Sequence, residues 1–168
     1  LSKDILADID ADWVYVTPAC QDPTGAVLSE KRRKELLDWS STHEVAIIED
    51  GWDSDFHYGS QTLPTLFATD ETGSVIYLYT FWRLLYPLTS ATLVVLPPPL
   101  VDVFHASKRL SDPPFATADD VALCGLLENG YLEKHIRHIW KQYRKRRQTV
   151  MFELKKQLGN AITVQPYT

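Results

Sequence analysis

Several acidic side chains follow a short apolar run in this sequence. The run is Val45–Ile48, and the acids after it are Glu49, Asp50, Asp53 and Asp55. In open α/β sheets, ligands bind beyond the carboxyl ends of the strands. Carboxylates at such an edge can hold a cation or pair with a protonated heterocycle. A solvated acidic loop is the alternative that composition alone leaves open.

Other signatures of chemistry are sparse. The sequence has no GxGxxG, Walker A, HExxH or CxxC motif, and only seven glycines. His135 and His138 fall on one face of a predicted helix, but no third ligand accompanies them, so we expect no metal site. The two cysteines, Cys20 and Cys124, exclude a disulfide scaffold and favour a reducing, cytoplasmic setting.

Four apolar runs predict the strands that must position the acids, at residues 13–17, 45–48, 75–79 and 92–96. Helices are expected at about 30–42, 100–110, 117–129 and 131–158. This order predicts an α/β fold, a mostly parallel sheet with flanking helices. Because the strands are apolar throughout, we expect the sheet to be covered on both faces.

Three loops are expected to meet at one edge of this sheet, at residues 18–25, 50–58 and 80–90. We expect a ligand there.

The composition fits one domain with a core: 168 residues, 45% hydrophobic and a net charge of −5. No apolar run is long enough for a membrane span, and no signal peptide is visible. The basic run Lys141–Arg147 is interpreted as the solvated face of an amphipathic helix; contact with nucleic acid or phosphate is the alternative.

Four segments resemble one family in the same order along the chain. The first segment, Thr17–Gly25 (TPACQDPTG), resembles the family motif T-P-x-x-Q-x-P-T-G, and the second, Glu49–Tyr58 (EDGWDSDFHY), resembles E-D-D-Y-D-S-E-F-R-Y. The third, Tyr79–Pro87 (YTFWRLLYP), resembles G-T-F-S-K-x-L-x-P. The fourth, Tyr143–Arg147 (YRKRR), resembles Y-x-x-R-R. The family is the aminotransferase-like domain of MocR-type (GntR-superfamily) transcriptional regulators, which is similar to class I aminotransferases of pyridoxal-phosphate fold type I.

The resemblance implies a cofactor site for pyridoxal 5'-phosphate. Asp50 matches the carboxylate that pairs with the pyridine nitrogen of the cofactor and keeps it protonated. Trp52 stands where the family has a tyrosine that hydrogen-bonds the phenolic oxygen, and Asp22 lies in the loop beside the ring. Thr80, in the phosphate-binding segment, is kept.

The remaining positions of that site depart from the family. Arg83 stands at the Schiff-base lysine, Trp82 replaces a phosphate-binding serine and Ser90 replaces a phosphate-binding arginine. Arginine stays protonated in proteins and cannot form the imine. Covalent cofactor binding and a catalytic residue are therefore not expected, although Arg83 could still hold an anion electrostatically.

The resemblance implies a domain organisation and a function. We expect a partial large domain over residues 1–130, and an interdomain helix with the start of a small domain over 131–168. We expect a catalytically inactive domain of a regulator that binds an amino-acid-like or pyridoxal-phosphate-like effector, forms homodimers, and reaches DNA only through an N-terminal winged-helix domain missing from this sequence. The alternatives are a pyridoxal-phosphate aminotransferase using another lysine, Lys108 being the nearest downstream, or a non-functional fragment. A partial domain is also expected to leave apolar surface that favours self-association.

Overall fold

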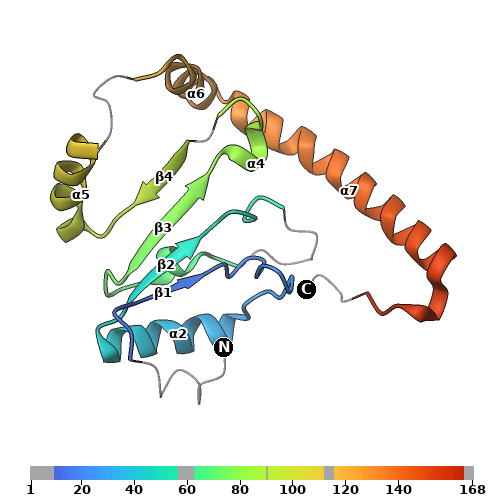
Figure 1. Ribbon diagram of the computed structural model, residues 1–168, viewed down its shortest axis with the longest axis horizontal. Helices are drawn as coiled ribbons and strands as arrows, with labels where there is room; N and C mark the ends of the chain where they lie inside the picture. Colours follow the sequence, from blue (N-terminus) through green and yellow to red (C-terminus); the bar gives the residue numbers. More distant parts are fainter. Residues whose placement is uncertain (1–9, 57–62, 90, 112–115, 165–168) are drawn as a thin grey trace.

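A single mixed sheet of four strands organises the chain in the computed structural model, which describes residues 10–56, 63–89, 91–111 and 116–164 (Figure 1). The strands are β1 (Trp13–Val16), β2 (Ala46–Asp50), β3 (Val75–Thr80) and β4 (Thr92–Val95), in the spatial order β1-β2-β3-β4. The first three strands are parallel, and β4 runs antiparallel to β3. The predicted mostly parallel α/β sheet is confirmed.

One face of the sheet is covered by helix α2 (Glu30–His43), which connects β1 to β2. Ser29 caps the start of the helix by accepting a hydrogen bond from the backbone N–H of Arg32. Leu36 and Trp39 pack against Ile47 of β2 in the main core. The short helix α3 (Leu66–Thr69), which the sequence analysis did not predict, adds to the same core.

The expectation that both faces are covered is wrong for the described residues. On β1, Trp13 and Tyr15 alternate with the core residues, and their exposed fractions are 59% and 51%. Helix α5 (Pro98–Ser111) follows β4 but contributes no buried residue to either core cluster. The apolar character of β1 predicts a cover for this face, and none of the described helices supplies it.

A second core lies at the other end of the sheet. Helix α4 (Trp82–Leu85), helix α6 (Ala118–Glu128) and helix α7 (Tyr131–Leu158) meet there around Phe56 and Phe81. Leu123 of α6 and Leu132 of α7 are buried in this core. A short 3₁₀ turn, η1 (Gly159–Ala161), follows α7. Figure 1 shows α7 extending far beyond the sheet.

The long helix α7 has the bounds that the sequence predicts, because its apolar side chains keep helical spacing over all 28 residues. Helix α4 was missed because its four residues lie in a segment expected to be a loop. None of the helices within the described ranges is long and apolar enough to cross a membrane.

Candidate functional site

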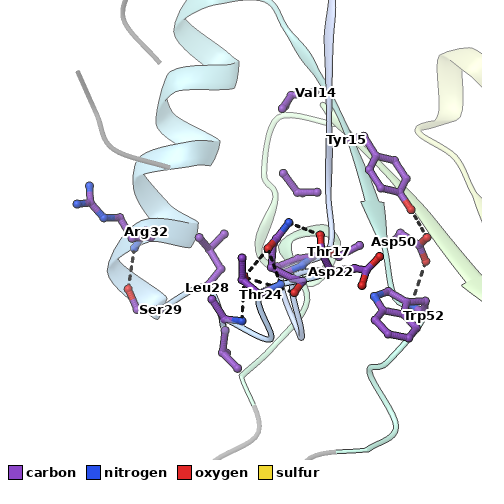
Figure 2. A pocket seen from close by; sticks show the side chains of 15 residues that line it. Val14, Tyr15, Thr17, Asp22, Thr24, Leu28, Ser29, Arg32, Asp50 and Trp52 are labelled. Atoms are coloured by element: carbon purple, nitrogen blue, oxygen red, sulfur yellow. Dashed lines mark hydrogen bonds between the residues drawn. The ribbon is translucent and has the colours of Figure 1, made fainter. Parts of the chain in front are cut away.

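A large open hollow lies beside the ends of β1 and β2. Its volume is about 1090 Å³, and its walls come from β1, from the following loop, from the start of α2 and from the end of β2. Of the predicted site residues, it brings together Asp22, Asp50 and Trp52 (Figure 2). Tyr15 and Arg32 also line it. We refer to this hollow as the β1–β2 pocket.

Asp50, the last residue of β2, is held by two donors. The backbone N–H of Trp52 donates to Asp50 Oδ1 at 2.9 Å, and the hydroxyl of Tyr15 donates to Oδ2. The indole Nε1–H of Trp52 donates to the backbone carbonyl of Cys20 at 3.2 Å, which ties the loop after β2 to the loop after β1. The carboxylate is thus fixed in orientation at the wall of the pocket.

Arg83 lies next to this wall but is committed to other partners. Its Nη1 is 2.9 Å from Oδ1 of Asp53, and the two side chains are 31% and 7% exposed. The guanidinium carbon lies 4.6 Å from the ring centroid of Trp52 and 5.2 Å from that of Phe56. Its charge is therefore largely compensated inside the chain, and it does not line the β1–β2 pocket.

The other residues of the predicted phosphate site lie apart from the pocket. Thr80 ends β3, and its Oγ1 accepts a hydrogen bond of 3.4 Å from the backbone N–H of Trp82. Trp82 is exposed and makes an edge-to-face contact with Tyr86, with ring centroids 5.1 Å apart. Neither Thr80 nor Trp82 lines the pocket. Ser90 lies outside the described residues.

A buried arginine and a buried glutamate form hydrogen bonds with the loop after β1 and with the start of α3. Arg33 of α2 donates to the backbone carbonyls of Pro18, Leu28 and Pro64, each at 2.9 Å. Glu49 of β2 accepts hydrogen bonds of 2.9 Å from two backbone N–H groups at the start of α3. Burial raises the pKa of Glu49 above its ordinary value, and those two hydrogen bonds act in the opposite direction. The loop after β1 is thus anchored to the α2 side of the sheet.

Burial and the nearby acids raise the pKa values of Tyr15 and Cys20. Burial, the hydrogen bond to Asp50 and the charges of Asp50 and Asp22 raise the pKa of Tyr15 to about 12. Burial and a hydrogen bond to Asp53 raise the pKa of the Cys20 thiol to about 11. Both groups therefore stay protonated at neutral pH, and Cys20 is not activated as a nucleophile.

Sequence reasoning missed Tyr15 and Arg33 as parts of this arrangement, and it named Asp53 in the acidic cluster without its partner Arg83. The signal for Tyr15 was the two-residue period of a strand, because Tyr15 pairs with Ile48 and therefore shares a face with Asp50. No sequence signal paired Asp53 with Arg83, since that contact depends on the turn between β3 and α4.

The remaining candidates lie elsewhere. Lys108 lies on α5, beyond β4, and does not line the pocket. His135 of the predicted histidine pair donates its Nε2–H to the carbonyl of Leu84 at 2.9 Å. Within the described part of the chain, no three His, Cys, Asp or Glu side chains are grouped as metal ligands would be.

These positions fit pyridoxal 5'-phosphate only in part. Asp50 offers a fixed carboxylate to a protonated ring nitrogen, and Tyr15 and Trp52 offer aromatic walls. The attachment points do not fit, because an arginine paired with Asp53 holds the expected lysine position and Trp82 does not line the pocket. Among the described residues, Asp50, Tyr15 and Trp52 could thus contact a heterocyclic ring, whereas the Arg83 side chain could not form an imine.

Comparison with known proteins finds similarity to transcriptional regulators and to aminotransferases. The chain is 32% identical over 151 residues to the HTH-type transcriptional regulator YhdI of Bacillus subtilis (strain 168), covering 90% of this chain and 32% of that protein. It is 28% identical over 151 residues to the probable rhizopine catabolism regulatory protein MocR of Rhizobium meliloti, covering 90% of this chain and 31% of that protein. No family model matches the chain.

Solved structures place the fold among aminotransferases. The multiple substrate aminotransferase from Thermococcus profundus superposes with a TM-score of 0.83 at 30% identity, over 92% of this chain and 40% of that one. The chain is therefore a partial aminotransferase-like domain, of the family that MocR-type (GntR-superfamily) regulators share with aminotransferases of pyridoxal-phosphate fold type I. It spans about a third of the length of the two regulators it matches.

Proposed function

We propose that the chain is part of a catalytically inactive, effector-binding and dimerising domain of a MocR-type transcriptional regulator. The observation that supports the proposal is the Arg83–Asp53 ion pair, because the resemblance implies that Arg83 stands at the position of the Schiff-base lysine. An arginine remains protonated at all accessible pH values, so it cannot attack an aldehyde. The β1–β2 pocket keeps the part of the site that would hold a protonated heterocycle.

In this function, the β1–β2 pocket binds a small-molecule effector reversibly. The ligand is a small molecule with an aromatic ring or an amino-acid-like group, and pyridoxal 5'-phosphate itself would bind without a covalent bond. Contact with DNA would be made by a winged-helix domain outside this sequence. We further propose that residues 1–130 are a partial large domain and that 131–168 lead into a small domain, in a cytoplasmic homodimer.

The test is to incubate the chain with pyridoxal 5'-phosphate, reduce any imine with borohydride and locate pyridoxyl groups by peptide mass spectrometry. We expect no site-specific adduct and no internal-aldimine absorbance band. The Arg83→Lys variant restores the amine and is expected to gain an adduct at position 83 if that position faces the cofactor. A specific adduct at any lysine of the unmodified chain would refute the proposal.

An aminotransferase is the second candidate, favoured by the 30% identity to the Thermococcus profundus enzyme. In that case Lys108 is the nearest downstream amine in the sequence. Amino-group transfer that disappears in Lys108→Ala would establish this candidate. A non-functional fragment is the third, and it is expected to bind neither pyridoxal 5'-phosphate nor pyridoxamine 5'-phosphate.

A further inference from the structure

The hydroxyl of Tyr15 is the one side-chain donor that the structure records on Asp50 within the described residues. Tyr15 pairs with Ile48 in the parallel register of β1 and β2, so its ring projects from the same face as Asp50, two residues further along β2. Figure 2 shows the Tyr15 ring directed toward the Asp50 carboxylate at the wall of the pocket. Tyr15 is therefore placed by the sheet and not by a loop.

The two oxygens of Asp50 have different donors. Oδ1 accepts from the backbone N–H of Trp52 at 2.9 Å, and Oδ2 accepts from the Tyr15 hydroxyl. Two donors at separate oxygens fix the carboxylate plane. Each carboxylate oxygen can accept two hydrogen bonds, so both keep one acceptor position that no donor among the described residues occupies.

We propose that Tyr15 is a positioning residue that holds the Asp50 carboxylate in the orientation that a protonated ring nitrogen of the ligand requires. This inference rests on the proposed function and adds the chemistry of the ligand. The class it selects is an aromatic heterocycle with a protonated nitrogen, seated between the carboxylate and the aromatic walls made by Tyr15 and Trp52. The second carboxylate of the lining, Asp22, makes the same end of the pocket unfavourable for an anion.

The balance of charge along the pocket agrees with this class of ligand. Arg32 is the cation in the described lining, and its Nη1 lies 2.5 Å from Oε2 of Glu35, so its charge is partly compensated. Arg83 is paired with Asp53 outside the lining. The carboxylates of Asp22 and Asp50 are thus the charges that a ligand meets beside the aromatic walls.

The probe for the test is pyridoxamine 5'-phosphate, because it carries the pyridine ring but no aldehyde and cannot form an imine with surface lysines. Affinity is measured by calorimetry for the unmodified chain, Tyr15→Phe, Asp50→Asn and the double variant. We expect Tyr15→Phe to weaken binding about tenfold, as for loss of one hydrogen bond to a charged group. Asp50→Asn should weaken it at least as much. The double variant should bind no more weakly than Asp50→Asn, because Tyr15 acts through Asp50.

Tyr131→Phe is the matched control, since Tyr131 is exposed at the start of α7, outside the pocket, and its loss of a hydroxyl should leave affinity unchanged. A purely structural role for Tyr15 would weaken binding equally in the Asp50→Asn background, and that result would overturn the inference. An unchanged affinity in Tyr15→Phe would also overturn it, while leaving the proposed function intact.

A titration without ligand separates failure of the inference from failure of the proposed function. The ionisation of Tyr15 is followed by the ¹³Cζ chemical shift of labelled tyrosine, assigned with Tyr15→Phe. Asp50→Asn is expected to move the Tyr15 midpoint to lower pH, because it removes the negative charge beside the phenol. A lower midpoint supports the inferred contact even if the unmodified chain binds no pyridoxamine 5'-phosphate, which would count against the proposed function. An unchanged midpoint overturns the inference.

Discussion

The guanidinium of Arg83 and the carboxylate of Asp53 form an ion pair with a separation of 2.9 Å, and Trp52 and Phe56 lie over the guanidinium. The carboxylate is almost buried, whereas the arginine is one-third exposed. The pair joins helix α4 to the loop that follows β2. It therefore stabilises the part of the chain next to the β1–β2 pocket.

Removing Arg83 should destabilise the chain, because Asp53 would be left as a buried charge without this cation. We expect Arg83→Met to lower the free energy of unfolding by about 2 kcal/mol, less than for a fully buried pair because Arg83 is partly in water. The measurement is urea unfolding followed by tryptophan fluorescence. Arg32→Met is the control, since its pair with Glu35 is more exposed and should change stability by less than about 1 kcal/mol. Equal losses in the two variants would contradict the structural role of the pair.

Arg33 should tolerate no replacement, even by lysine. Its three donors reach three backbone carbonyls that belong to separate segments, and a lysine ammonium on a flexible stem cannot reproduce that fork. We expect Arg33→Lys to lower the free energy of unfolding by about 2–4 kcal/mol, since buried carbonyls lose their donors. Thermal melting by circular dichroism measures the loss, with Lys34→Arg on the exposed side of α2 as the control. A melting temperature within one degree, roughly, of the unmodified chain would refute this role.

Gly51 should accept no side chain, because it lies between Asp50 and Trp52 directly against Tyr77. A Cβ at Gly51 would lie 2.8 Å from Cζ of the Tyr77 ring. We expect Gly51→Ala to cost about 1–3 kcal/mol of stability through this overlap and to displace Asp50. Gly125→Ala in α6 is the matched control, since no atom lies within 4 Å of its added Cβ, and it should be neutral or stabilising. A harmless Gly51→Ala would show that Tyr77 moves away freely.

Asp70 should make stability depend on pH at the acid end. Burial by itself raises the pKa of Asp70, but hydrogen bonds from Thr72, Ser74 and Val75 outweigh it and hold the pKa below its ordinary value. A carboxyl with a lowered pKa in the folded chain stabilises it above the pKa of the unfolded chain. That contribution is lost as the pH falls through the lower folded value.

We therefore expect Asp70→Asn to lower the melting temperature at pH 7 and to lose less stability than the unmodified chain as the pH falls from about 5 to 3. Melting curves across this range measure the effect. Glu71→Gln, one residue further along the exposed turn, is the control. Parallel pH profiles for Asp70→Asn and the unmodified chain would contradict the assignment.

Much of the fold could be predicted from local patterns. The apolar runs at 45–48 and 75–79 lie in parallel strands, and the helical spacing of residues 131–158 forms α7, because burial of these side chains requires those elements. The open face of β1 could not be predicted, since an apolar strand indicates that a cover is needed but not whether this chain supplies it. The turn of α4 was missed because four residues are too few for a periodic signal.

The candidate site was predicted less completely. Asp22, Asp50 and Trp52 share the pocket because their loops follow neighbouring parallel strands. Thr80 and Trp82 lie apart from them, and the pairing of Arg83 with Asp53 depends on side-chain packing that the sequence alone does not specify. The two-residue period of β1 indicates which face Tyr15 shares, but its contact with Asp50 also depends on the register between β1 and β2, which the sequence alone does not specify.

The length of helix α7 makes the position of its far end sensitive to small movements at its first turn. With a rise of 1.5 Å per residue, its 28 residues form a rod about 42 Å long. Leu132, close to its first residue, is clamped in the core beside Phe56 and Leu84, whereas Val150 and Phe152 in its second half are exposed. A tilt of about 10° at the clamped end would swing the far end by roughly 7 Å. Small repacking around Phe56, in the loop that also carries Trp52 and Asp53, would thus be amplified into a large displacement at the tip of the rod.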